Sequence, residues 1–266
     1  GAIRNPIVIW GARFLENWAY RHSTRIIALS PGMKEGVVKT GCPDSKVTVI
    51  PNSCDLELFS VNEEQCRAFR KSYPWLGDRP LILYCGALGL INGVDYFVYL
   101  AEEIWKLDPE VRFLVVGDGR EEEKVRTLAR QKGVLDKNFF MFSRFLKKDV
   151  PVIFKAADIS TSWVIDIKEL WHNSANKFFD SLAAGTPVAI NYGGWQADIL
   201  KNNGAGIELD AKDMTRAAHS LLKVVHDKDW LKKAGAAAAN LAREEFSRDK
   251  LANQFEKVIL EAVKSG

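Results

Sequence analysis

The chain has 266 residues, of which 47% are hydrophobic and 27% charged, and its formal net charge is +3 at pH 7. These proportions are those of an ordinary globular protein, and the length suffices for one large domain or for one domain and part of another. The small net charge gives no support for nucleic-acid binding, which depends on a basic stripe interleaved with aromatic side chains. No segment approaches the roughly 20 apolar residues of a membrane span.

The first predicted element is an amphipathic helix over residues 6–20. Trp10, Phe14 and Trp18 recur on it at i, i+4 and i+8, and such an apolar stripe has to pack on something. We expect it to pack on protein, with a membrane surface as the alternative because several arginines lie nearby.

Strand-like and helix-like segments then alternate along the chain. The strand-like runs lack a polar–apolar alternation, which is typical of strands buried on both faces of a parallel sheet. They cover 25–30, 46–51, 80–86, 112–117, 138–142, 158–163 and 187–192, and the helical patterns cover 94–107, 121–132, 175–184 and 214–226. This alternation predicts an α/β fold with a doubly wound, Rossmann-like parallel sheet. Residues 229–265 are expected to form two or three further helices.

The four cysteines are Cys42, Cys54, Cys66 and Cys85. They form no CxxC pair and have no spacing typical of a disulfide framework or a zinc site. We therefore expect a protein of the reducing cytoplasm.

Two glycine-bearing loops follow predicted strands, where open α/β sheets bind their ligands. Glycines in the loop from Gly86 to Gly93 would allow a phosphate to approach the backbone, although a tight turn alone would also require them. Gly117 and Gly119 match only the first two glycines of a GxGxxG fingerprint, because Glu122 takes the third position. This partial match also follows the second strand of the domain, so a nicotinamide or flavin dehydrogenase is disfavoured.

A third motif, residues 173–188, is the most specific. Asn173 or Ser174 is expected to cap a helix that ends at Gly185. Lys177 falls in the first turn, where the helix dipole disfavours a cation unless an anion is near. Lys177 and Asp180 share one helix face, so they form either a local ion pair or a ligand site in which Lys177 binds a phosphate and Asp180 a pair of hydroxyls.

Five segments occur in an order that resembles a known family. They are 49–55, 86–93, 113–119, 149–158 and 180–188. The first is similar to the end of the amino-terminal domain of the retaining, GT-B-fold glycosyltransferases of family 4. The other four are similar to the carboxy-terminal, nucleotide-sugar-binding domain of that family. The resemblance covers about residues 21–266 and implies a GT-B carboxy-terminal domain preceded by a remnant of a second α/β domain.

This resemblance implies a site for a nucleotide sugar, UDP-linked or else GDP-linked, with no cofactor and no metal. Lys177 is then the candidate catalytic residue, because it would stabilise the leaving phosphate. Asp180 takes the place of the acidic residue that holds the ribose diol, and the base is expected near Arg144 and Phe145. The other donor-binding candidates lie in the three loops and are Gly86, Gly89, Asn92, Gly93, Gly117, Asp118, Gly119, His172, Asn173, Ser174, Ala175 and Asn176.

Three positions depart from the family pattern. Many members carry arginine and lysine where this chain has Ala87 and Asn92, and a glutamate where it has His172. Since a departing diphosphate needs positive charge, we expect Lys177 and helix amino termini to replace the missing cations, with Arg144 as a further option. Residues 174–180 resemble a subgroup that includes amino-sugar transferases of bacterial surface polysaccharides, which by analogy implies a UDP-linked N-acetylated sugar.

The predicted function is transfer of a sugar to a hydroxyl acceptor in polysaccharide or lipopolysaccharide synthesis, with retention. The alternatives are another GT-B enzyme, such as a nucleotide-sugar 2-epimerase, and a non-catalytic nucleotide-binding module. A cytoplasmic location is expected, with peripheral contact at the inner face of the membrane as an option if the acceptor is lipid-linked.

The predicted domain organisation has four parts. Residues 1–59 are the truncated tail of an acceptor-side amino-terminal domain, and 60–79 form a polar, charged linker. Residues 80–245 form the donor-binding domain, and 246–266 a carboxy-terminal helix for which packing back on the amino-terminal part is one option. The sugar or lipid-linked acceptor would bind the mostly absent domain, so this fragment alone is expected to be inactive.

Overall fold

The computed structural model describes residues 5–265, which divide into two compact units. The larger unit holds residues 52–171 and 175–248, and the smaller one the other described residues. The predicted boundary after residue 59 differs from the edge of the larger unit at Asn52. Residues 52–59 join that unit because the backbone of Cys54 pairs with Phe246 (N···O 2.7 Å) and Arg248 (O···N 3.1 Å).

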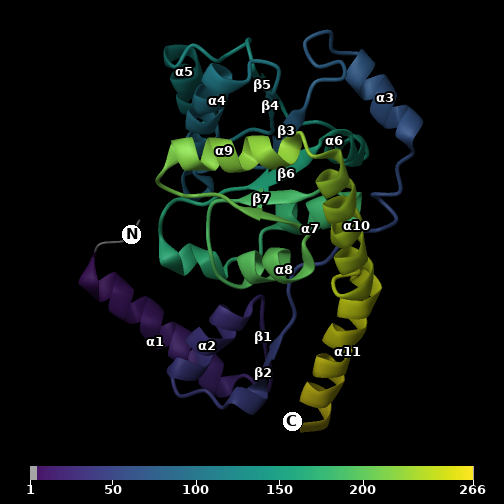
Figure 1. Cartoon of the computed structure of the whole chain (residues 1–266). Helices are drawn as coiled ribbons and strands as arrows, with labels where there is room; N and C mark the ends of the chain where they lie inside the picture. The colour runs from purple at the N-terminus through teal and green to yellow at the C-terminus, as the bar shows by residue number, and fades with distance from the viewer. Residues whose placement is uncertain (1–4, 266) are drawn as a thin grey trace. The chain divides into compact units, whose positions relative to one another are not determined.

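The larger unit is built on a six-stranded sheet in which every neighbouring pair is parallel (Figure 1). Its strand order is β5-β4-β3-β6-β7-β8. The strands are β3 Leu81–Cys85, β4 Arg112–Val116, β5 Phe139–Phe142, β6 Ile159–Ser162, β7 Val188–Ile190 and β8 Gly206–Glu208. From β3 the chain proceeds to one side as far as β5 and then returns to the other side at β6. The predicted doubly wound α/β fold is confirmed.

Helices cover both faces of this sheet. One face carries α4 Asp95–Leu107, α5 Glu122–Gln131 and α9 Met214–Val225. The other carries α3 Glu63–Lys71, α6 Val150–Ala156, α7 Asn176–Ala184, α8 Trp195–Asn203 and α10 Lys228–Glu244. The four helices predicted from periodicity within this unit are confirmed, with ends displaced by one residue or so. The region after 229 holds the rest of α10 and one further helix, α11 Arg248–Ser265.

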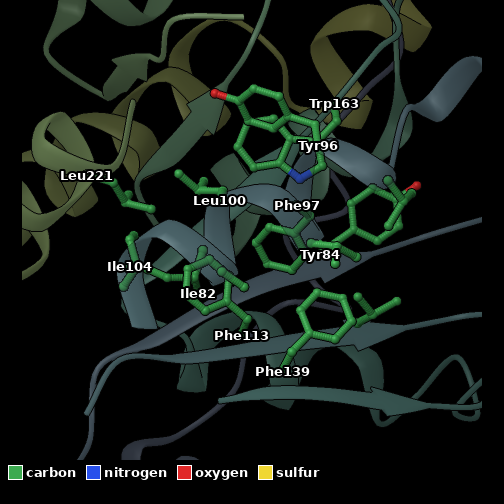
Figure 2. Packing of buried hydrophobic residues seen from close by; sticks show 14 of the residues in the cluster. Ile82, Tyr84, Tyr96, Phe97, Leu100, Ile104, Phe113, Phe139, Trp163 and Leu221 are labelled. Atoms are coloured by element: carbon green, nitrogen blue, oxygen red, sulfur yellow. The ribbon is translucent and has the colours of Figure 1, made fainter. Parts of the chain in front are cut away.

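The core on the α4 side is rich in aromatic rings (Figure 2). Tyr84 of β3 and Phe113 of β4 pack around Phe97 of α4, and the Phe97 and Phe113 ring centroids are 5.0 Å apart. The neighbouring strand residues Leu81 and Leu83 point to the opposite cluster. Strand β3 is therefore buried on both faces, as its continuous apolar sequence predicts, and its end is held firmly.

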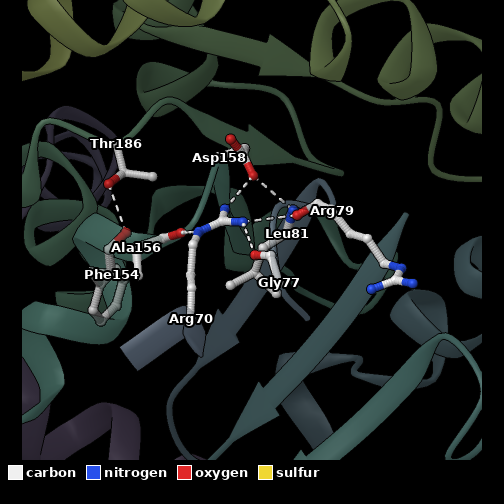
Figure 3. A network of polar contacts seen from close by, with 8 residues as sticks. All are labelled: Arg70, Gly77, Arg79, Leu81, Phe154, Ala156, Asp158 and Thr186. Atoms are coloured by element: carbon white, nitrogen blue, oxygen red, sulfur yellow. Dashed lines mark hydrogen bonds and ion pairs between the residues drawn. The ribbon is translucent and has the colours of Figure 1, made fainter. Parts of the chain in front are cut away.

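Residues 60–79 were expected to be a linker, and the structure corrects this expectation: they are folded onto the larger unit. Helix α3 begins with a capping box formed by Asn62 and Gln65. Trp75 then stacks on Phe140 with centroids 3.8 Å apart. The side chain of Arg70 donates to Asp158 (2.7 Å) and to three backbone carbonyls, as Figure 3 shows. The contacts with Phe140, Ala156 and Asp158 are distant in sequence, so local composition does not reveal them.

The smaller unit contains a two-stranded parallel sheet of β1 Ile26–Ala28 and β2 Val47–Val49. Helix α2 Pro31–Lys39 packs on it through Val37, and η1 Asp44–Lys46 is a short 3-10 turn before β2. Leu251 and Val258 of α11 pack on Ile50 of the same unit, and Arg25 pairs with Glu261 at 3.4 Å. Helix α11 thus belongs with the amino-terminal strands.

The predicted first helix is confirmed as α1 Pro6–His22. None of its described residues is buried, and Trp10, Phe14 and Trp18 are 69%, 57% and 53% exposed. Its apolar stripe is therefore open in this structure. Within residues 5–265 no helix is both long enough and apolar enough to cross a membrane.

Candidate functional site

The candidate site lies at the carboxyl edge of the sheet in the larger unit. Strand β3 has β4 on one side and β6 on the other, so the connections that leave β3 and β6 run in opposite directions. Open α/β sheets bind ligands at such a switch point. The glycine loop follows β3, and α7 follows β6, so the topology brings the first and third sequence motifs to one place.

The two glycine loops pack directly on each other. Gly86 N donates to Val116 O (2.9 Å) and Leu88 N to Asp118 O (2.8 Å). Gly117 has a φ of +144°, and a Cβ built on it would lie 2.0 Å from the carbonyl oxygen of Gly86. No side chain fits there, so the glycine at 117 is explained by loop packing. Its presence does not require a ligand.

Lys177 reaches from the first turn of α7 to the loop after β3. Its Nζ donates to Asn92 Oδ1 at 2.9 Å and to Tyr84 OH at 3.3 Å, and lies 4.9 Å from the centre of the Tyr84 ring. A Cβ on Gly86 would lie 3.0 Å from Lys177 Cε, so this glycine makes room for the lysine. The structure thus brings together three predicted site residues, Gly86, Asn92 and Lys177.

Among the residues that the structure describes, neither Lys177 nor Asp180 forms an ion pair. Burial lowers the pKa of Lys177 to about 8. Burial, with a smaller contribution from Asp55 opposed by Lys147, raises the pKa of Asp180 to about 6. The local ion pair considered from the sequence is therefore not formed, and both groups ionise at a cost. Perturbed groups of this kind are typical of binding sites.

The amino terminus of α7 differs from the predicted cap. The N-cap residue is Ala175, which has no side-chain oxygen, so the expectation that Asn173 or Ser174 caps this helix is wrong. Asn176 is the first helical residue, and its Oδ1 accepts from Asn52 Nδ2 at 2.7 Å. The predicted end at Gly185 is confirmed, with a φ of +66°. The first turn therefore presents N–H groups that its N-cap side chain does not satisfy.

Arg144 and Asp118 lie at the ends of neighbouring strands and form an ion pair. Arg144 Nη2 is 2.6 Å from Asp118 Oδ1, and the arginine side chain is 75% exposed. Phe145 packs near Phe142, with centroids 6.0 Å apart. The pair joins the loops after β4 and β5, and the guanidinium is engaged by a carboxylate, so it is a weaker candidate than Lys177 for an anion.

His172, Asn173 and Ser174 belong to the smaller unit. There the carbonyl oxygen of His172 accepts from Ser30 Oγ at 2.6 Å, and the His172 ring lies against Gly32, where a Cβ would be 1.9 Å from Nδ1. These contacts give His172 a packing role within that unit.

A hollow of about 340 Å³ lies at the same edge of the sheet, on the α4 side of the glycine loop. Gly89 and Gly93 line it together with Asp95, Tyr99 and Lys124, whereas Lys177 and Asp180 do not. Lys124 Nζ is 2.7 Å from Asp95 Oδ2, so this cation is already paired. Sequence reasoning identified only Gly89 and Gly93 of this lining, because the other walls belong to no motif.

Tyr84 was also missed as a site residue. It is fully buried near the end of β3, and its hydroxyl donates to Ala87 O at 2.7 Å while accepting from Lys177. The available signal was a tyrosine in an otherwise aliphatic run just before the glycine loop. In residues 5–265 no group of three or more histidine, cysteine or carboxylate side chains is placed to hold a metal ion.

The family model described as "Glycosyl transferases group 1" matches residues 66–241, and "Glycosyltransferase Family 4" matches 4–58. The chain belongs to the group 1 glycosyltransferases. An uncharacterised glycosyltransferase of Methanocaldococcus jannaschii is 26% identical over 87% of this chain and 58% of its own length. An Escherichia coli enzyme named UDP-Gal:alpha-D-GlcNAc-diphosphoundecaprenol alpha-1,3-galactosyltransferase is 25% identical over 81% of this chain and 55% of its length.

This glycosyltransferase chain thus spans just over half the length of the curated relatives it matches. Among solved structures, Anabaena HepE in complex with UDP-glucose is similar with a TM-score of 0.80 and 15% identity, over 93% of this chain and 66% of that one. WaaG, a glycosyltransferase of lipopolysaccharide biosynthesis, has a TM-score of 0.71 and 17% identity, over 87% and 62% of the two chains. The sequence identities are too low to show more than the fold. The structural similarity confirms the GT-B fold implied by the sequence motifs.

Proposed function

We propose that the larger unit binds the sugar donor of a glycosyl transfer, and that the donor is a UDP-sugar. The observation that carries this proposal is the unpaired ammonium of Lys177, which lies beside a glycine loop and on the first turn of a helix. An ammonium without a carboxylate partner, at a helix amino terminus, is a place for an anion. A diphosphate supplies two such charges.

Each site residue has a role in this proposal. Lys177 and the first N–H groups of α7 bind the diphosphate, and the backbone of the loop at Gly86 lies beside it. Asp180, one turn further along α7, accepts hydrogen bonds from the ribose hydroxyls. Phe145 and Arg144 lie beside the base. The binding free energy of the diphosphate offsets the cost of keeping Lys177 charged and buried.

The proposed reaction breaks the bond between the anomeric carbon and the β-phosphate oxygen, and forms a bond from that carbon to an acceptor oxygen. The nucleoside diphosphate leaves with the bonding pair, and the proton of the acceptor hydroxyl passes to the departing phosphate oxygen. Lys177 acts where negative charge grows on the leaving oxygen, so its contribution is larger in the transition state than in the ground state. Retention at the anomeric carbon is the part of the proposal that rests on the family resemblance alone.

Two observations favour UDP and a polysaccharide or lipopolysaccharide role. The HepE structures hold UDP, UDP-glucose, or UDP and glucose, and the E. coli relative is named for a UDP-Gal donor and a diphosphoundecaprenol acceptor. Other relatives are named for GDP-mannose, so GDP is the competing donor class to be tested. A lipid-linked or free sugar hydroxyl is the proposed acceptor in the whole protein.

Calorimetric titration with UDP, GDP and NAD tests the proposal. We expect UDP to bind, NAD not to bind, and Lys177→Ala and Asp180→Ala each to weaken UDP binding at least tenfold. Lys124→Ala is the matched control, because it removes a lysine from the neighbouring hollow, and it should leave UDP affinity within twofold. Equal binding by Lys177→Ala and the unmodified chain would overturn the assignment, and preference for GDP would correct the base.

A further inference from the structure

Asn92 uses both ends of its side-chain amide. Its Oδ1 accepts from Lys177 Nζ at 2.9 Å, and its Nδ2 donates to the carbonyl oxygen of Ala87 at 2.9 Å. An amide with a donor partner on one side and an acceptor partner on the other has one orientation. Asn92 is the last residue of η2 Leu90–Asn92, which follows the packed glycine loop. The amide is thereby fixed with its oxygen toward Lys177.

Tyr84 completes a closed ring of hydrogen bonds. Its hydroxyl donates to the same Ala87 carbonyl at 2.7 Å and accepts from Lys177 Nζ at 3.3 Å. Burial raises the pKa of Tyr84, so its hydroxyl keeps its proton. Both groups that accept from the Lys177 ammonium are therefore neutral. Hydrogen bonds in such a ring support one another, and they hold the ammonium in place without cancelling its charge.

We infer that Asn92 is a positioning residue that holds the Lys177 ammonium toward the donor diphosphate while leaving its charge free for that ligand. This inference rests on the proposed function. Beyond that function, we infer that the side chain at position 92 acts on the donor through Lys177 and that this side chain has to be uncharged.

An aspartate at position 92 would have nearly the same shape and the opposite effect. It would place a carboxylate about where Asn92 Oδ1 lies, 2.9 Å from Lys177 Nζ, and an ion pair in a partly buried place competes with an incoming diphosphate. Its second oxygen would face the Ala87 carbonyl, where the amide now donates. An alanine would free the ammonium without adding charge. Donor affinity is therefore expected to fall in the order Asn, Ala, Asp.

The test measures UDP binding and urea unfolding for Asn92→Asp and Asn92→Ala at pH 7.5. We expect Asn92→Ala to weaken binding about threefold to tenfold and Asn92→Asp by well over tenfold. The matched control is Asn203→Asp, which makes the same chemical change at an exposed position on α8 and should leave binding unchanged. Equal losses for the Ala and Asp variants would overturn the requirement for neutrality.

A pH profile separates positioning from a structural role. The ionisable groups around Lys177 are Tyr84 and Cys85 of β3 and Asp180 on its own helix, and burial raises the pKa of both Tyr84 and Cys85. We expect UDP affinity of the unmodified chain to fall as the pH rises through about 8, where Lys177 loses its proton. In Asn92→Asp that fall should move to higher pH, because a carboxylate stabilises the ammonium. An unmoved profile would contradict the inference.

The outcomes distinguish this inference from the function it rests on. If the unmodified chain binds no nucleoside diphosphate, the proposed function fails. If the chain binds UDP and Lys177→Ala weakens it, but Asn92→Asp binds as well as the unmodified chain, only the role of Asn92 fails. Asn92→Asp could weaken UDP binding only because it destabilises the fold, which a lowered urea midpoint would reveal. Asn92→Ala then decides whether Asn92 positions Lys177, provided that its urea midpoint matches that of the unmodified chain. Unchanged UDP binding by that variant would contradict the inference, because loss of the amide alone must weaken binding.

Discussion

Lys177 and Asp180 lie three residues apart on α7, yet burial shifts the pKa of each toward its neutral form. The structure gives Lys177 two neutral acceptors and leaves Asp180 without an ion-pair partner among the described residues. This arrangement costs folding free energy, and such costs are usual where a site is built for a ligand that is not part of the fold. Lys177 and Asp180 are therefore the two residues whose surroundings indicate a ligand site.

Asp180→Asn is expected to stabilise the chain at neutral pH. The folded-state pKa of Asp180 is about 6, above its ordinary 3.8, so burial of the ionised carboxylate costs free energy above pH 6, and the cost disappears as the pH falls toward 3.8. The gain should be roughly 1–2 kcal/mol at pH 7.5, allowing for solvent around a partly exposed group, and smaller at pH 5. Urea unfolding at both pH values measures it. A gain that is equal at both would contradict the account.

Gly117→Ala is expected to destabilise the larger unit by about 2–4 kcal/mol, because a Cβ there would meet the Gly86 carbonyl and the backbone cannot move aside. Gly204→Ala is the matched control. Gly204 also has a positive φ, +66°, but nothing lies within 4 Å of its Cβ position, so about 1 kcal/mol is expected. The urea midpoints of the two variants separate the effect of a steric clash from that of backbone strain. Equal losses of unfolding free energy would rule out the close approach of position 117 to the Gly86 carbonyl as the reason.

At the scale of elements, the sequence predicted those helices and strands whose pattern lies within their own residues. Strands β3 and β4 and helices α4 and α7 have continuous apolar or periodic patterns, and all four form where expected. Strand β8 was missed, because its three residues Gly-Ile-Glu carry one apolar side chain. The segment 60–79 was misread because its anchors are far away: Arg70 contacts Asp158, and Trp75 stacks on Phe140.

In the candidate site, too, contacts between residues far apart in the sequence could not be predicted. Lys177 was identified because a cation at a helix start is locally unfavourable without an anion. Its partners Tyr84 and Asn92 lie 93 and 85 residues earlier in the chain, and no spacing rule connects them to it. Asn92 was identified as a departure from the family pattern, but its contact with Lys177 required the structure.

Helix α3 provides the prediction at this scale. Arg70→Leu should cost about 3 kcal/mol, because it leaves the partly buried Asp158 carboxylate without its cation and three backbone carbonyls without a donor. Arg79→Leu is the control, since Arg79 pairs with the exposed Glu110 and should cost under about 1 kcal/mol. The urea midpoint checks both. A loss below 1 kcal/mol for Arg70→Leu would contradict the role of Arg70 as an anchor of this segment.

At the scale of the whole molecule, the topology of the larger unit supports the proposal that it binds the sugar donor. Strands β4 and β5 are added on one side of β3, and strands β6 to β8 on its other side. Because all these strands are parallel, their carboxyl ends lie at one edge of the sheet. The loop after β3 and the helix after β6 therefore meet there, and they supply Asn92 and Lys177. The smaller unit combines the two amino-terminal strands with α11, so segments from opposite parts of the described chain share one compact unit.

The most direct test is a crystal structure of the chain with bound UDP. We expect the diphosphate to lie within hydrogen-bond distance of Lys177 Nζ and of the first N–H groups of α7. The ribose hydroxyls should lie at Asp180, and Asn92 should still contact Lys177. A diphosphate bound in the hollow beside Asp95, Tyr99 and Lys124, with Lys177 untouched, would contradict it.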